Sequence, residues 1–129
     1  MNVYDRLEEL GIKLLDPTPK GGIYSLVRPY GDHLLYVSGT APHNAVDSNM
    51  AGKLGSEYTI EEGQEAARRC MINIISNLHH ELGDLNRIKQ FVKLLGFVAS
   101  APDFYEHPQV INGASQLLKD VFGDEIGLP

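Results

Sequence analysis

The clearest pattern of apolar positions predicts a long helix that begins at Thr59. Residues 59–62 fit a capping box, in which a threonine hydroxyl and a glutamate carboxylate satisfy the first backbone N–H groups of a helix. Apolar residues then recur at steps of three and four until Gly83, a residue type that commonly ends helices. We expect this stripe to face the core; it consists of Ala67, Cys70, Met71, Ile74, Ile75, Leu78 and Leu82.

Two further helices are predicted from the same spacing. One begins near Pro108, because proline suits a first helical turn, and ends before Gly123. Its apolar stripe consists of Val110, Ile111, Ala114, Leu117, Leu118 and Val121. A shorter helix lies at the N-terminus, where Asn2 can cap it and Gly11 can end it. Its apolar residues are Val3, Leu7 and Leu10.

Two short runs of apolar and β-branched residues predict a hairpin. Residues 23–27 and 34–37 are such runs, and residues 28–32 between them contain Pro29, Gly31 and Asp32, which are typical of turns. The two strands should therefore pair antiparallel.

The segment 88–100 is apolar almost throughout, which suits either a buried strand or a buried helix. Its aromatic and β-branched residues and Gly96 favour a long central strand. Residues 41–58, rich in glycine and short polar side chains, predict a long loop with a short strand near residues 53–54. A loop of this length beside a candidate site is a candidate cover for it.

The order of these elements predicts an α+β fold in which two helices cover one face of a sheet. With 129 residues, 43% of them hydrophobic, the chain is long enough for one domain with a single core.

Charge narrows the classes of partner. The chain has 17 acidic and 11 basic residues and a formal net charge of −6, so its field should repel nucleic acids and anionic membranes. The first ten residues contain no apolar run typical of a secretory signal, and no stretch of the chain is apolar enough to span a membrane. We therefore expect a cytoplasmic protein.

Cysteine and histidine indicate no metal or redox chemistry. The single cysteine, Cys70, lies among apolar neighbours and is interpreted as a buried, inert thiol. The five histidines show no spacing typical of metal ligands. We expect no metal and no organic cofactor.

The best candidate for chemistry is the group Tyr24, Ser38 and Gly39, on the two predicted strands. Glycine at the end of a strand lets a ligand approach the main chain, so backbone N–H groups and the Ser38 hydroxyl could together bind a carboxylate. Taken singly, a tyrosine on a strand is more often a packing residue, and Ser-Gly after a strand is more often a turn.

The whole ordered pattern resembles the RidA/YjgF family of enamine and imine deaminases. The resemblance is carried by Gly22-Ile23-Tyr24-Ser25 and by Leu34-Leu-Tyr-Val-Ser38-Gly39-Thr40, and it extends through nearly the entire chain. The N-terminal helix resembles one subgroup of that family. The resemblance implies a chorismate-mutase-like ββαβαβ fold and a homotrimer with sites at the clefts between subunits.

The resemblance also implies a substrate pocket. Tyr24, Ser38 and Gly39 match the family's pocket residues, and Asn112 resembles its pocket asparagine, although the spacing from Asp103-Phe104 is longer. From spacing alone, Asn112 is equally well explained as an exposed helix residue beside the apolar stripe.

The catalytic assignment remains incomplete on this sequence. The family's substrate anchor is an arginine just after the second helix, where a guanidinium can bind a carboxylate bidentately. The sequence reaches Gly127-Leu128-Pro129 where that motif would begin. We therefore expect the natural chain to continue past Pro129, so that residues 1–129 form one domain that is incomplete at its C-terminus and lacks the final strand.

Three functions follow, in order of preference. The first is hydrolysis of short 2-imino or 2-enamino acids to 2-oxo acids and ammonia, which needs orientation and proton transfer but no cofactor. The second is a noncatalytic trimer that binds or senses small carboxylates in the same cleft. The third is an endoribonuclease, which the acidic charge balance disfavours.

Overall fold

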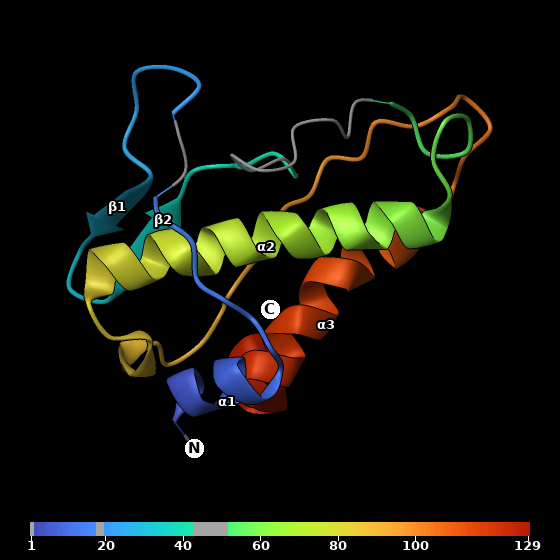
Figure 1. The fold of residues 1–129 in the computed structure, drawn as a ribbon. Helices are drawn as coiled ribbons and strands as arrows, with labels where there is room; N and C mark the ends of the chain where they lie inside the picture. The colour runs from blue at the N-terminus through green and yellow to red at the C-terminus, as the bar shows by residue number, and fades with distance from the viewer. Residues whose placement is uncertain (1, 18–19, 43–51) are drawn as a thin grey trace.

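Three helices form the body of the molecule, and a hairpin lies at one end of the longest helix (Figure 1). The structure is a computed structural model that describes residues 2–17, 20–42 and 52–129. The elements in order are α1 (Val3–Glu9), β1 (Val27–Tyr30), β2 (Leu34–Val37), α2 (Ile60–Leu82), the 3-10 turn η1 (Leu85–Arg87) and α3 (His107–Gly127). Helix α2 packs against α3 and β1, while α1 packs against α3 and η1. The predicted α+β class is confirmed.

Helix α2 begins and ends as its sequence predicts. The Thr59 hydroxyl accepts a hydrogen bond from Glu62 N (3.3 Å), and the Glu62 carboxylate accepts one from Thr59 N (3.1 Å). Gly83 ends the helix at φ 76°, a left-handed conformation that costs glycine little. Local sequence alone therefore determines both ends of this helix.

Glycines allow α2 and α3 to cross at close range. A Cβ added to Gly113 on α3 would lie 2.1 Å from the Gln64 carbonyl oxygen on α2. A Cβ on Gly63 would lie 2.6 Å from Leu54 and 3.1 Å from Val110. Beyond this crossing the apolar stripes of both helices form the core, with buried Met71, Ile75, Leu78, Leu117, Leu118 and Val121.

The two other helices differ from expectation only at their ends. Helix α1 is capped by the Asn2 side chain, which accepts a hydrogen bond from Tyr4 N. Helix α3 was expected to end before Gly123 but continues to Gly127 after an interruption at Gly123 (φ 82°, ψ 169°). Glycine tolerates this conformation, so the chain turns there and then resumes helical geometry.

The hairpin is confirmed, with its second strand at the predicted residues 34–37 and its first strand further along the chain than predicted. Strand β1 contains Arg28 and Pro29, which were assigned to the turn, and Val27 pairs with Val37. The turn is confined to residues 31–33, where Gly31 has φ 66°. Proline fits β1 because this strand lies at a sheet edge, where a missing N–H costs no ladder bond.

The prediction of a long central strand over residues 88–100 was wrong for this structure. A strand needs a neighbouring strand for its backbone groups, and among the described residues this segment forms a bridge of that kind only with Leu54. Leu54 N donates to Ala99 O and Ala101 N donates to Leu54 O, both at 2.9 Å. The rest runs beside the helices without strand pairing, and the Phe97 side chain is 88% exposed.

The predicted loop over residues 41–58 lies partly outside the described residues, which exclude 43–51. Its described part contains the expected short strand as an isolated bridge at Leu54, which is buried. In the described ranges no helix is both long and apolar enough to cross a membrane.

Candidate functional site

Tyr24 lies just before β1, and its ring covers the backbone of the preceding glycines. Its hydroxyl oxygen accepts a hydrogen bond from Gly21 N at 3.0 Å, and the side chain of this residue is partly exposed. A Cβ added to Gly22 would lie 3.8 Å from the ring. The Tyr24 hydroxyl hydrogen remains available as a donor to a ligand, because its oxygen acts as the acceptor in the bond with Gly21.

Ser38 extends the hairpin beyond its last strand pair. Its backbone N–H donates to Leu26 O (2.9 Å), and its hydroxyl donates to Ser25 O (2.6 Å). The sequence suggested that the Ser38 hydroxyl would donate to an anion, but here its hydrogen is already used. Ser38 instead fixes the backbone beside Tyr24 to the end of β2.

Gly39 presents bare backbone to open space. A Cβ built at Gly39 meets no atom of the described residues within 4 Å, and the residue is exposed. Its N–H has no hydrogen-bond partner within the described ranges, so it can serve a ligand. The structure therefore brings together three of the four predicted residues, Tyr24, Ser38 and Gly39, through the Ser38–Ser25 hydrogen bond.

Helix α2 holds the segment that follows Gly39. The Asn73 amide, only 2% exposed, donates to Ala41 O (3.1 Å) and contacts the Thr40 hydroxyl (3.4 Å). The Cys70 thiol donates to Thr40 O at 3.6 Å, and burial raises the pKa of this thiol. The sequence analysis missed Asn73. Its position beside the apolar stripe of a core helix could have indicated a buried amide, which needs hydrogen-bond partners.

Asn112 lies away from Tyr24 within one chain. It is exposed on α3 beside Gly113, which packs against Gln64 near the start of α2. Ser25 and Val27 instead line a hollow with Asn77 and His80 near the other end of α2. From Gln64 to Asn77 the helix rises about 20 Å at 1.5 Å per residue. In Figure 1 the hairpin lies at one end of α2 and the start of α3 at the other.

The hollow beside Ser25 supplies polar groups that the sequence analysis did not assign. It has a volume of 330 Å³, and its lining includes Lys20, Asn77, His80 and Glu81. Lys20 is a cation four residues from Tyr24 in sequence, and His80 Nε2 lies 3.1 Å from Leu15 O. These side chains come from a loop and a helix end, so spacing in the sequence could not have grouped them.

The described residues contain no group of three or more histidine, cysteine, aspartate or glutamate side chains placed to hold a metal ion. The arrangement offers instead an open backbone, a phenolic donor and a nearby polar hollow. Such groups can orient a small carboxylate by hydrogen bonds.

Comparison with known proteins gives consistent matches over nearly the whole chain. A family model described as "YjgF/chorismate_mutase-like, putative endoribonuclease" matches residues 5–127. The chain is 45% identical over 122 residues to "Protein TCP17" from Trypanosoma cruzi, a match covering 94% of this chain and 75% of that protein.

Two solved structures share the fold. A protein with unknown function from Agrobacterium tumefaciens matches with a TM-score of 0.85 and 38% identity, over 95% of this chain and 75% of that one. A "putative endoribonuclease" from Shewanella oneidensis MR-1 matches with a TM-score of 0.90 and 33% identity, over 97% of this chain and 82% of that one.

Proposed function

Because this chain belongs to the YjgF/chorismate-mutase-like family, we propose that it hydrolyses short 2-imino or 2-enamino acids to 2-oxo acids and ammonia. The observation that carries the proposal is the open backbone at Gly39, at a hairpin end that the Ser38–Ser25 hydrogen bond fixes to the segment carrying Tyr24. This geometry supports binding of a small carboxylate, and the deaminase chemistry follows from the resemblance to RidA-type proteins.

The proposed reaction asks little of the protein beyond orientation. Water adds to the imine carbon to give a carbinolamine, the carbon–nitrogen bond then breaks, and the nitrogen leaves as ammonia while a carbonyl forms. The Gly39 N–H and the Tyr24 hydroxyl would hold the substrate carboxylate, and solvent or a polar neighbour would carry the protons. No metal ion or organic cofactor takes part in this scheme.

We further propose that the working unit is a cytoplasmic homotrimer. The separation of Asn112 from Tyr24 in one chain supports a site completed by a second copy, whose Asn112 would approach the first copy's Gly39. In this arrangement the substrate, a 2-imino or 2-oxo acid, lies in the cleft between subunits. Nucleic acids and membranes have no part in it.

The test is release of 2-oxo acid from an imine made in situ by an amino-acid oxidase. The parent protein should accelerate release, Gly39→Ala should retain part of the effect, and Gly39→Val should abolish it because its side chain fills the ligand space. Tyr24→Phe should weaken competitive binding of a 2-oxo acid by about 1 kcal/mol, roughly fivefold in Kd.

Tyr105→Phe is the matched control for Tyr24→Phe, since Tyr105 is an exposed tyrosine outside the hairpin and outside the candidate site. Equal activity in the parent and in Gly39→Val would place the site elsewhere. Binding of 2-oxo acids without turnover would favour the second candidate, a noncatalytic carboxylate-binding trimer.

An endoribonuclease has two specific observations in its favour, the description of the matching family model and that of the Shewanella oneidensis relative. The net charge of −6 opposes it, because binding to a phosphate backbone depends on basic side chains. This alternative would be supported if the parent protein cleaves a single-stranded RNA and Gly39→Val does not. RNA that stays intact after incubation with the parent would contradict it.

A further inference from the structure

A second hollow lies between α1, η1 and the C-terminal part of α3, and it is separate from the candidate site at Gly39. Its volume is 370 Å³, which falls in the range of small-ligand cavities. Its floor is apolar and includes Val3, Val121 and Phe122, all buried, together with Ile88 and Ile126.

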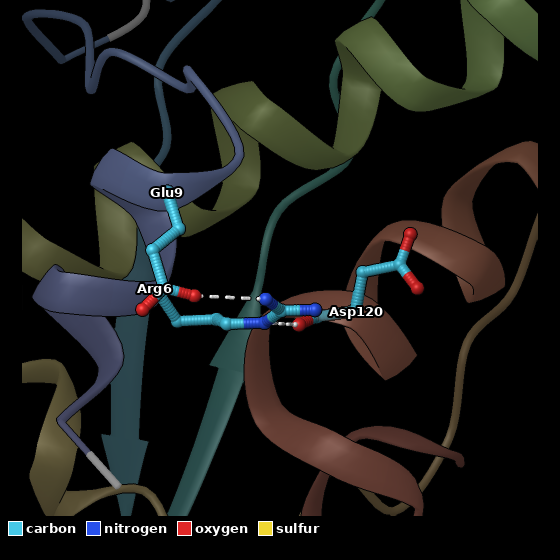
Figure 2. A network of polar contacts seen from close by, with 3 residues as sticks. All are labelled: Arg6, Glu9 and Asp120. Carbon is cyan, nitrogen blue, oxygen red and sulfur yellow. Dashed lines mark hydrogen bonds and ion pairs between the residues drawn. The ribbon is translucent and has the colours of Figure 1, made fainter.

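The interruption of α3 at Gly123 shapes this hollow. In an unbroken helix the Asp120 carbonyl would accept the N–H of Asp124, which here lies beyond the interruption. Arg6 takes its place: its Nε donates to Asp120 O at 2.7 Å, and its Nη1 pairs with the Glu9 carboxylate at 3.0 Å. Figure 2 shows the Arg6 side chain reaching from α1 to Asp120 on α3, with Glu9 of α1 beside its guanidinium.

Three charged side chains line the hollow. Arg6 and Lys119 carry positive charge, and Asp120 carries negative charge. The Asp120 carboxylate accepts a hydrogen bond from Gln116 Nε2 (2.8 Å), and in Figure 2 it points away from the Arg6 guanidinium.

Both cations keep donors for a ligand. Arg6 uses Nε and Nη1 in its contacts with Asp120 and Glu9, which leaves the N–H groups of Nη2. Lys119 is 47% exposed and makes only a long contact, 3.8 Å, with the Asp124 carboxylate. An incoming carboxylate could therefore pair with both residues without breaking the link between α1 and α3.

We propose that this hollow binds a small carboxylate with an apolar body, such as a medium-chain fatty acid or an aromatic acid. The carboxylate lies at Arg6 and Lys119, and the apolar body lies on Val121 and Phe122. The available donors select this class: the unused N–H groups of Arg6 Nη2 and the weakly held Lys119 ammonium lie at the edge of an apolar hollow. The site is independent of the proposed deaminase chemistry.

The test compares three probes with the same eight-carbon body: octanoate, octanol and octylammonium. Calorimetric titration of the purified protein should show octanoate binding about tenfold tighter than the other two, because only it forms charge-assisted hydrogen bonds with the two cations. Amide chemical shifts should change around residues 3–6 and 119–123. Equal affinity for octanol, preference for octylammonium, or no binding of octanoate would each overturn the proposal.

Charge reversal at the rim supplies the variant test. Lys119→Glu should weaken octanoate binding by about tenfold, whereas Lys13→Glu, the same change at an exposed residue outside the hollow, should leave it unchanged. Thermal unfolding verifies that both variants fold, as expected for exposed positions.

Two further measurements distinguish binding in this hollow from binding at the hairpin and from self-association. Gly39→Val should bind octanoate as well as the parent does; loss of binding would assign the ligand to the hairpin site instead. An octanoate affinity that falls as protein concentration rises would show that a second copy of the chain occupies the hollow, and this too would contradict the proposal.

Discussion

At the scale of single residues, hydrogen bonds decide which polar groups remain free for a ligand. Ser38 has both of its donors committed within the hairpin, whereas Gly39 beside it has open space in front of its backbone. Asn73 is buried but satisfied, because it holds the segment that follows Gly39. A glycine and a phenol are thus the accessible groups here, and the serine acts as their support.

Cys70 gives a prediction on pH. Burial raises the pKa of its thiol in the folded protein, so the unfolded chain ionises first as the pH rises. The stabilisation from the neutral thiol is complete below the unfolded pKa and is lost as the pH rises through the folded pKa. Between about pH 8 and 10, Cys70→Ala should therefore lose less unfolding free energy than the parent. Chemical denaturation across this range measures the unfolding free energy of both proteins. An equal change of this free energy with pH in the variant and the parent would contradict the prediction.

At the scale of elements, close packing of α2 and α3 fixes how the helices cross. Gly113 has no room for a side chain because the Gln64 carbonyl of the facing helix lies where a Cβ would be. Alanine in a helix is favoured over glycine by about 0.5–1 kcal/mol, while overpacking costs typically about 1–3 kcal/mol. A clash with backbone cannot be relieved by rotating a side chain, so the packing cost should dominate.

We therefore expect Gly113→Ala to lower the unfolding free energy by about 1–3 kcal/mol. Gly39→Ala is the control, since its added Cβ meets open space, and its effect should stay within about 0.5 kcal/mol. Urea denaturation of the two variants and the parent measures both values. Unchanged or greater stability in Gly113→Ala would show that the two helices can separate at little cost.

At the scale of the whole molecule, apolar side chains remain exposed on the hairpin and on the segment 88–100, among other places. On the hairpin face that turns away from α2, Tyr30 and Tyr36 meet edge to face at 6.3 Å beside Leu34. On the segment 88–100, Val92, Leu95 and Phe97 are exposed. Apolar side chains that are exposed side by side are typical of interaction sites between subunits.

The proposed homotrimer predicts a sedimenting mass three times the 14.2 kDa of one chain at micromolar concentration. Tyr36→Lys should dissociate it, because the change places a charge within the apolar hairpin face. Tyr105→Lys is the control, an equal change at another exposed tyrosine outside the hairpin. A parent protein that sediments as a monomer would remove the cleft between subunits and Asn112 from the site.

The sequence by itself determined the features that depend on neighbours in the chain. The capping box of α2, its glycine stop, the Asn2 cap of α1 and the existence of a hairpin were all predictable, because each depends on contacts within a few residues. The pattern around Tyr24, Ser38 and Gly39 also pointed to the family that the comparisons show.

Only the tertiary structure decided the features that depend on distant partners. The segment 88–100 has the composition of a strand, yet strand pairing requires a neighbouring backbone, which the described residues supply only at Leu54. The use of the Ser38 hydroxyl depends on the Ser25 carbonyl across the hairpin, and the hollow beneath Arg6 and Lys119 depends on how α1 packs on α3 at the Gly123 interruption. The distance of Asn112 from Tyr24 depends on how α2 and α3 cross. That crossing depends on packing between residues about 50 positions apart, such as Gln64 and Gly113, which local patterns do not encode.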